Sequence, residues 1–335
     1  MDLDSKIKSI LVTGGCGFIG SNFINHMAEN NSELLILNLD KVQRGSSPNN
    51  VVSSVRNSDR YRFFYGNYGQ KDLVFQILET FKVDAIVHFA AMSHVDESFQ
   101  DPSGCFENNV THMVPLLEAC KEYGKLSRFV HISTDEVYGD SEMGEQARAK
   151  KETDRLDPTN PYSASKAACE MLVNAYRHCG ELPLVTIRMN NVYGPRQYES
   201  KVIPKFILKT FNNEPLTLQG DGSQLRNWLF VEDACYGIRL VLQLGTVGSV
   251  YNIGTRYEHN ILEVANEIQK AVAKTRGITP EPITFVPVPN RPYNDQRYLI
   301  DAQKIKNELG WSCSTTFTEG LRITVDWYYR ELLEE

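Results

Sequence analysis

Two short stretches of the sequence carry side chains suited to acid-base chemistry. Thr134, Asp135 and Glu136 provide a hydroxyl and two adjacent carboxylates, and Tyr162 and Lys166 follow at the i, i+4 spacing of one helix face. A Lys ammonium beside a phenol stabilises the phenolate and brings the Tyr pKa toward a value useful at neutral pH. Thr134 can complete a proton relay to a substrate hydroxyl. Taken alone, each stretch has an ordinary alternative: a solvated carboxylate pair in a loop, or a Tyr-Lys pair on a surface helix.

A buried strand is predicted to deliver the first of these stretches. The apolar run 128–132 reads as that strand, and Ser133 to Glu136 follow at its carboxyl end. In open α/β sheets this edge is where ligands bind. Neighbours on a regular strand point to opposite faces, whereas at a strand end both carboxylates can face one cleft. One can then act as an acid and the other as a base if their environments differ.

A glycine-rich turn lies near the N-terminus, between a predicted strand at 10–13 and a predicted helix at 21–29. Gly14, Gly17 and Gly20 in this context are typical of a dinucleotide-binding turn that brings a helix N-terminus to a pyrophosphate. Asp40 ends the next strand, where a carboxylate meets ribose hydroxyls and repels a 2'-phosphate. NAD is therefore favoured over NADP, although Lys41 and Arg44 weaken the preference. A packed strand-helix turn remains the alternative.

The first half of the chain alternates strands and helices, which predicts a doubly wound parallel sheet of Rossmann type. Strands are expected at 10–13, 34–40, 61–65, 85–89, 128–132 and 184–188, and helices at 21–29, 71–80, 108–123 and 163–178. After Gly194-Pro195 the alternation fails and a smaller mixed α/β lobe is expected, with helices at 261–273 and 317–333. We divide the chain into a dinucleotide-binding domain at 1–190, with a return at about 228–252, and a substrate lobe at 191–335.

Composition is that of an ordinary globular protein, with 335 residues, 41% hydrophobic and 23% charged. A net charge of -7 without runs of like charge argues against nucleic acid or an anionic membrane as partner. No apolar stretch approaches the length of a spanning helix or forms the core of a signal peptide. Seven cysteines without metal-ligand spacing predict reduced thiols, no metal and a cytoplasmic enzyme.

Further motifs run along nearly the whole chain. They include His88-Phe89-Ala90-Ala91, Ser93-His94-Val95-Asp96, Asn160-Pro161-Tyr162, Asn191-Val192-Tyr193-Gly194-Pro195, Lys201-Val202-Ile203-Pro204 and Asn290-Arg291-Pro292-Tyr293-Asn294-Asp295-Gln296-Arg297. With the glycine turn and the Thr-Asp-Glu stretch, the chain resembles an extended short-chain dehydrogenase/reductase, specifically a nucleotide-sugar 4,6-dehydratase of the dTDP-glucose or UDP-glucose type. Such enzymes serve deoxysugar biosynthesis, including that of rhamnose.

The resemblance implies a redox cycle on NAD. Tyr162, as phenolate, would take the proton of the sugar C4 hydroxyl while C4 gives hydride to NAD+. Glu136 would remove the C5 proton and Asp135 would protonate the departing C6 hydroxyl. Hydride would then return to C6, giving a 4-keto-6-deoxy sugar. Simple oxidation needs only the Tyr and Lys, whereas elimination needs an additional base and acid.

The same matching implies two sets of binding residues. The NAD set is Gly14, Gly17, Phe18, Ile19, Gly20, Asp40, Lys41, Asn67, Tyr68, Phe89, Ala90, Ala91, Ser93, Asn108, Tyr162 and Lys166. The nucleoside-diphosphate-sugar set is His94, Asn191, Lys201, Val202, Arg226, Arg291, Asn294 and Arg297. His94 has a structural alternative, as a histidine bonded to Asp96.

Two positions depart from the family pattern. Asn67 stands where many relatives have Asp, and its amide oxygen could accept the adenine amino hydrogen bond without charge assistance. Asn294 replaces a His of many bacterial dTDP-glucose enzymes, which leaves UDP a serious candidate.

Other functions stay open at this point. A nucleotide-sugar 4-epimerase or a UDP-glucuronate decarboxylase would share the glycine turn, Tyr162 and Lys166, but not the need for Asp135 and Glu136. A catalytically silent NAD-binding regulator is the alternative outside enzymes. The family also implies a homodimer, built on the helices predicted at 108–123 and 163–178.

Overall fold

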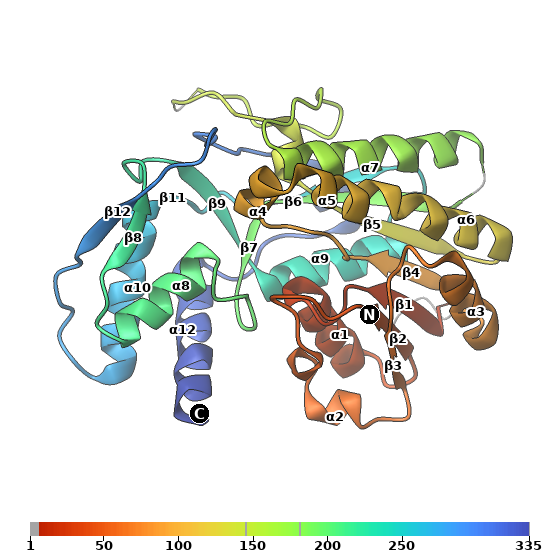
Figure 1. Ribbon diagram of the computed structural model, residues 1–335, viewed down its shortest axis with the longest axis horizontal. Coiled ribbons are helices and arrows are strands. Elements are labelled where there is room, and N and C mark those ends of the chain that lie inside the picture. Colours follow the sequence, from red (N-terminus) through yellow and green to blue (C-terminus); the bar gives the residue numbers. More distant parts are fainter. Residues whose placement is uncertain (1–6, 145, 181, 335) are drawn as a thin grey trace.

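A seven-stranded parallel sheet forms the centre of the computed structural model, which describes residues 7–144, 146–180 and 182–334 (Figure 1). The strand order is β10-β6-β5-β4-β1-β2-β3. The bounds are β1 (Ser9–Thr13), β2 (Leu35–Asp40), β3 (Tyr61–Tyr65), β4 (Ala85–His88), β5 (Arg128–Thr134), β6 (Leu184–Met189) and β10 (Val250–Ile253). The predicted Rossmann-type architecture is confirmed, and its last strand comes from the second half of the chain.

Helices cover both faces of this sheet because its strands are apolar on both sides. Helices α1 and α9 lie on one face, and α3, α6 and α7 on the other (Figure 1). The bounds in this part are α1 (Phe18–Asn30), α2 (Ser53–Arg56), α3 (Lys71–Phe81), α4 (Val95–Gln100), α5 (Pro102–Phe106), α6 (Met113–Tyr123), α7 (Pro161–His178) and α9 (Val231–Leu244). The helix predicted at 108–123 is interrupted, since Glu107–Thr111 is a π-helical turn that precedes α6.

The second lobe is smaller and mixes short strands with helices at one end of the sheet (Figure 1). Its strands are β7 (Asn191–Tyr193), β8 (Leu216–Gln219), β9 (Leu225–Phe230), β11 (Glu258–Asn260) and β12 (Phe285–Val288), and its helices are α8 (Val202–Phe211), α10 (Ile261–Arg276), α11 (Gln303–Leu309) and α12 (Phe317–Glu334). The order β11-β9-β7 forms one small sheet, and β12 pairs in parallel with β8.

One continuous core joins the two lobes. It runs from Ile10 and Phe23 under α1 to Tyr193 and Phe206 of the second lobe, all of which are fully buried or nearly so. A second core fills the space between the other sheet face and helices α3 and α6. Residues of both lobes therefore pack into one hydrophobic core. No helix among the described residues has the length and apolar content needed to cross a bilayer.

Candidate active site

A cleft of about 760 Å³ lies at the carboxyl ends of the central strands, where they meet the second lobe. Its walls include the residues after β1 and β4, the end of β5 and the residues after β6. This volume is in the range of pockets that hold small molecules and cofactors. Of the residues predicted from sequence to form the site, the cleft brings together all except Asn67 and Arg297.

Asp135 and Glu136 both line the cleft although they are neighbours in sequence. Strand β5 ends at Thr134, and Asp135–Tyr138 forms a 3₁₀ helix that Thr134 caps by accepting the Glu136 N–H at 3.3 Å. Successive side chains on a 3₁₀ helix are separated by about 120° rather than the 180° of a strand. The change of backbone at this point is what allows the two carboxylates to share one cleft.

Each carboxylate is held by a different asparagine. Asn190 Nδ2 donates to Asp135 Oδ2 at 2.7 Å, and Asn160 Nδ2 donates to Glu136 Oε2 at 3.1 Å. A second hydrogen bond, at the amide oxygen, orients each of these side chains. Asn190 Oδ1 accepts the Thr255 N–H, and Asn160 Oδ1 accepts the Ser163 N–H as the N-cap of α7. Neither asparagine is among the residues predicted for the site. The only indication in the sequence is that Asn160 lies two residues before Tyr162 and that Asn190 directly precedes Asn191.

Burial raises the pKa of Asp135 to about 7, with the negative charge of Glu136 adding to the effect. Hydrogen bonds from Asn190 and Thr134 and the charge of Arg226 act in the opposite direction. The Asp135 side chain is only 2% exposed, whereas Glu136 is half-buried. A carboxyl group with this pKa carries its proton at neutral pH often enough to serve as a general acid.

Tyr162 and Lys166 project from the first turns of α7 into the same cleft. The Tyr162 pKa is raised rather than lowered, chiefly by burial and then by the charge of Glu136, while a hydrogen bond with Thr134 acts to lower it. Burial also lowers the pKa of Lys166. Lys166 is not among the causes that shift the Tyr162 pKa, so activation of the phenol by Lys166 stays a prediction.

The glycine turn fits a dinucleotide pyrophosphate. Gly14 has φ +75°, and a Cβ there would lie 2.6 Å from the Ala90 nitrogen, so no other residue fits without movement. Gly17 caps α1 without a side-chain hydrogen bond, and a Cβ there would meet only the Gly14 oxygen at 3.3 Å. The first N–H groups of α1 consequently face the cleft with room for an anion.

Residues predicted for the adenosine end mostly line the cleft, with one exception. Asp40 uses its carboxylate to accept the N–H groups of Cys16 and Val42 at 2.9 and 2.7 Å, which fixes its place beside the turn. Lys41 donates to Asn108 Oδ1 at 2.6 Å. Asn67 instead closes a local turn by accepting the Gly69 N–H, and it does not line the cleft.

The second lobe supplies positive charge to the other end of the cleft. Lys201 donates to the Ser93 carbonyl at 3.0 Å, and Arg291 forms an ion pair with Asp96 at 2.6 Å. Arg226 lies 4.6 Å from the centre of the Tyr298 ring and donates to the Asp295 carbonyl. Three cations around one cavity suit a diphosphate.

Two further polar side chains of the cleft complete this end. Asn191 Oδ1 is buried without a hydrogen-bond partner among the described residues, which suits a ligand donor. His94 contacts Ser200 at 3.2 Å rather than Asp96, and burial lowers its pKa to about 4. Val202 and Asn294 also line the cavity.

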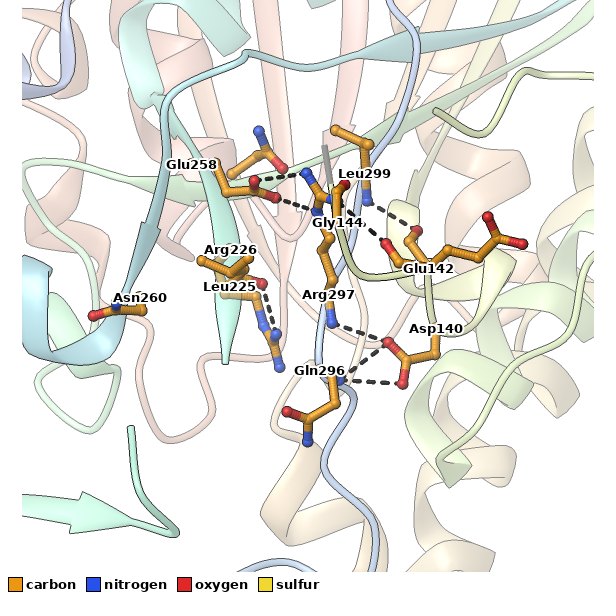
Figure 2. A network of polar contacts seen from close by, with 12 residues as sticks. Asp140, Glu142, Gly144, Leu225, Arg226, Glu258, Asn260, Gln296, Arg297 and Leu299 are labelled. Atoms are coloured by element: carbon orange, nitrogen blue, oxygen red, sulfur yellow. Dashed lines mark hydrogen bonds and ion pairs between the residues drawn. The ribbon is translucent and has the colours of Figure 1, made fainter. Parts of the chain in front are cut away.

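Arg297 is predicted to bind the nucleotide sugar, but it does not line the cleft, and Figure 2 shows the polar contacts that it makes instead. Its guanidinium forms two hydrogen bonds with Glu258, at 2.7 and 2.8 Å, and donates to the carbonyls of Glu142 and Gly144. Its backbone N–H donates to Asp140 at 2.9 Å. With four of its five guanidinium N–H groups in these bonds, Arg297 ties the segment after the 3₁₀ helix to the second lobe.

Sequence and structure comparisons agree with the geometry. A parallel sheet with a glycine turn after β1 and a Tyr-Lys pair at the carboxyl ends of the strands defines the short-chain dehydrogenase/reductase class. Within that class, the chain belongs to the family described as GDP-mannose 4,6 dehydratase, whose model matches residues 11–324.

The individual relatives of the chain include enzymes that dehydrate UDP-glucose or dTDP-glucose. The chain is 45% identical over 323 residues to a trifunctional UDP-glucose 4,6-dehydratase/UDP-4-keto-6-deoxy-D-glucose 3,5-epimerase/UDP-4-keto-L-rhamnose-reductase of Arabidopsis thaliana, covering 96% of this chain and 47% of that protein. It is 41% identical to a dTDP-glucose 4,6-dehydratase of Xanthomonas campestris, covering 95% and 92%. The chain thus spans about half the length of the plant relatives and nearly all of the bacterial one.

A solved structure gives the same picture. The dTDP-glucose 4,6-dehydratase DesIV of Streptomyces venezuelae, with NAD and TDP bound, superposes with a TM-score of 0.88 at 35% identity, covering 96% of this chain and 97% of that one.

Proposed function

We propose that the protein is an NAD-dependent nucleotide-sugar 4,6-dehydratase that converts dTDP-glucose or UDP-glucose to the 4-keto-6-deoxy sugar. The observation that carries this proposal is the pair of adjacent carboxylates, each held by its own asparagine, which line the same cleft as Tyr162 and Lys166. Oxidation or 4-epimerisation requires only a Tyr and a Lys at the sugar hydroxyl. A second acid and a second base serve elimination of water.

NAD is proposed to lie along the cleft from Asp40 to Tyr162. Its pyrophosphate would meet the N–H groups of Phe18 and Ile19 at the start of α1, and Asp40 would face the adenosine ribose. The remaining members of the set are Lys41, Tyr68, Phe89, Ala90, Ala91, Ser93 and Asn108, all of which line the cleft. The chemistry that bound NAD supplies is reversible hydride transfer, with hydride leaving the sugar at C4 and returning at C6.

The residues of the chain divide the proton transfers among them. Tyr162 accepts the proton of the C4 hydroxyl, with Lys166 as the positive charge nearest to it along the helix. Once C4 is a ketone the C5 proton is acidic, and Glu136 removes it. Asp135, whose pKa is about 7, protonates the departing C6 hydroxyl. Burial of this acid and partial exposure of the base keep their roles distinct.

The substrate's diphosphate is proposed to bind Lys201, Arg226 and Arg291, with Asn191, His94, Val202 and Asn294 beside it. In this proposal residues 1–190 with the return at about 228–252 bind the dinucleotide, and 191–335 bind the nucleotide sugar; α9 and β10 of the return pack on or within the central sheet.

A cytoplasmic homodimer is also proposed. Exposed Val114 on α6 and Met171 on α7 support that contact, and sedimentation at micromolar concentration tests it.

The decisive experiment incubates the purified protein separately with dTDP-glucose, UDP-glucose and GDP-mannose and follows the products by NMR. We expect a 4-keto-6-deoxy product from one or both glucose nucleotides. The double variant Asp135→Asn, Glu136→Gln should retain NAD and be at least as stable as the wild type but give no net dehydration. Undiminished product from that variant would refute the assignment, and a C4-epimer from the wild type would favour an epimerase.

A further inference from the structure

One cycle of the proposed dehydration exchanges the protonation states of Tyr162 and Asp135. This reasoning rests on the proposed function. At the start Tyr162 is a phenolate and Asp135 carries a proton. The sugar C4 hydroxyl then gives its proton to Tyr162, while the proton of Asp135 leaves in the water formed from the C6 hydroxyl. Glu136 takes the C5 proton and returns it to C5 when hydride reaches C6.

All atoms of the reaction are therefore accounted for, but one proton transfer within the enzyme remains before it is ready for another substrate. After product formation Tyr162 is neutral and Asp135 is a carboxylate, while total charge and proton number in the enzyme are the same as before. A second turnover requires one proton to pass from the phenol to the carboxylate. Exchange with solvent would accomplish this in two separate steps, whereas a direct link would accomplish it in one.

We propose that the Thr134 hydroxyl is that link, returning the proton from Tyr162 to Asp135 after each turnover. Thr134 Oγ1 donates to Asp135 Oδ1 at 3.3 Å, and Thr134 and Tyr162 line the same cleft, where Thr134 acts to lower the pKa of the phenol. It also accepts the Glu136 N–H at 3.3 Å, which holds the oxygen in place through the 3₁₀ cap. A hydroxyl has one donor and two acceptor sites, so these two bonds leave one acceptor site of Thr134 for the Tyr162 hydroxyl.

The polarity of these bonds suits transfer in the required direction. Thr134 releases its proton to Asp135 Oδ1 as it takes one from the phenol, and the hydroxyl is unchanged at the end. Asn190 occupies the other oxygen, Oδ2, and cannot reverse its amide because its own oxygen accepts the Thr255 N–H at 3.0 Å. Only Oδ1 remains to be protonated, and it is the oxygen that faces Thr134.

Burial makes the direct route more favourable than exchange with bulk water. Asp135 is 2% exposed and Thr134 is 8% exposed, so neither is openly hydrated. Negative charge on Asp135 and Glu136 opposes loss of the Tyr162 proton, and its transfer to Asp135 removes one of those charges. Lys166 is also buried and lines the same cleft, so its ammonium can stabilise the phenolate that results.

The test compares the first turnover with later ones in the holoenzyme. Wild type, Thr134→Val and Thr134→Ser are mixed with excess of the glucose nucleotide that the wild type converts, and product is followed by rapid quench. For Thr134→Val we expect a burst near one product per site, followed by a steady state slowed about tenfold or more relative to its own first turnover. Added imidazole at fixed pH and ionic strength should accelerate only that slow phase. Thr134→Ser keeps the hydroxyl and should show no burst.

A second readout is independent of product. In weak buffer with a pH indicator, wild type should exchange no protons with solvent during one turnover, and Thr134→Val should show uptake and release as separate phases. If Thr134→Val slows the first and later turnovers by the same factor, or shows no phases, Thr134 only positions the substrate and the link is refuted. Failure of the wild type to make a 4-keto product would instead refute the proposed function.

Discussion

Replacing Asp135 with Asn should stabilise the protein above neutral pH while it abolishes dehydration. Burial raises the pKa of this carboxyl from 3.8 to about 7. The native state therefore holds a proton that the unfolded chain releases, and wild-type stability falls as pH rises from about 4 to about 7. A shift of about 3 units corresponds to roughly 4 kcal/mol at about 1.4 kcal/mol per unit, and Asp135 is too buried for solvent screening to reduce this much.

An Asn side chain keeps the hydrogen bond from Asn190 at its oxygen, and its amide replaces the bond from Thr134 by one of reversed direction, with the Thr134 oxygen as acceptor. Urea unfolding followed by tryptophan fluorescence at pH 5, 6, 7 and 8 gives the difference in unfolding free energy between variant and wild type. That difference should favour the variant increasingly up to about pH 7 and then level off near 4 kcal/mol or somewhat below. Subtracting wild type at each pH removes the titration of all other groups. A flat difference, or one that favours wild type at pH 8, would refute the assignment of a buried, protonated acid.

Three other substitutions test the surrounding structure. Gly17→Ala should keep the wild-type melting temperature but bind NAD at least tenfold more weakly in titration calorimetry, because the added methyl group fits the fold yet fills the space of the phosphate. Gly14→Ala should also lower the melting temperature. Arg297→Met should lower the free energy of unfolding in urea by about 2–4 kcal/mol, because Glu258 loses its partner. Adding Glu258→Leu should recover much of this loss. An equal loss in the single and double variants would contradict a structural role for the Arg297–Glu258 ion pair. Asn190→Leu removes a hydrogen bond that lowers the pKa of Asp135, so the alkaline limb of kcat, expected near pH 7, should move to higher pH; an unmoved limb would mean that another group is the acid.

The sheet and the glycine turn were predictable because their signals are local. An apolar run bounded by a Gly-rich turn specifies a strand and a helix from residues that are adjacent in sequence, as for β1 and α1. Strand β12 was not predictable in this way. It lies in a segment with five prolines, and it forms because β8 offers a pairing edge that only the tertiary fold provides.

Charged residues of the second lobe show the same limit. Arg226, Arg291 and Arg297 are equivalent in the sequence as cations that suit a phosphate. The fold separates them, because Glu258 on β11 and the carbonyls of residues 142 and 144 use four of the five guanidinium donors of Arg297. Arg291 instead has one exposed carboxylate, Asp96, as its partner. A partner from a distant strand thus decides whether an arginine is structural or free to bind a ligand, and motif matching does not contain that information.

The difference between the two neighbouring carboxylates also comes from distant residues. Asp135 and Glu136 have nearly the same intrinsic chemistry, and nothing in their order specifies which is the acid. Asn190, fixed by the backbone after β10, holds Asp135 in the protein interior, and Asn160, fixed as the cap of α7, holds Glu136 at the wetter side of the cleft. Because Asn160 belongs to the same helix as Tyr162, any shift of α7 would move the base and the phenol together. In the proposed mechanism the geometry of elimination is therefore tied to that of oxidation, so that the C4 ketone would form where Glu136 can reach the C5 proton.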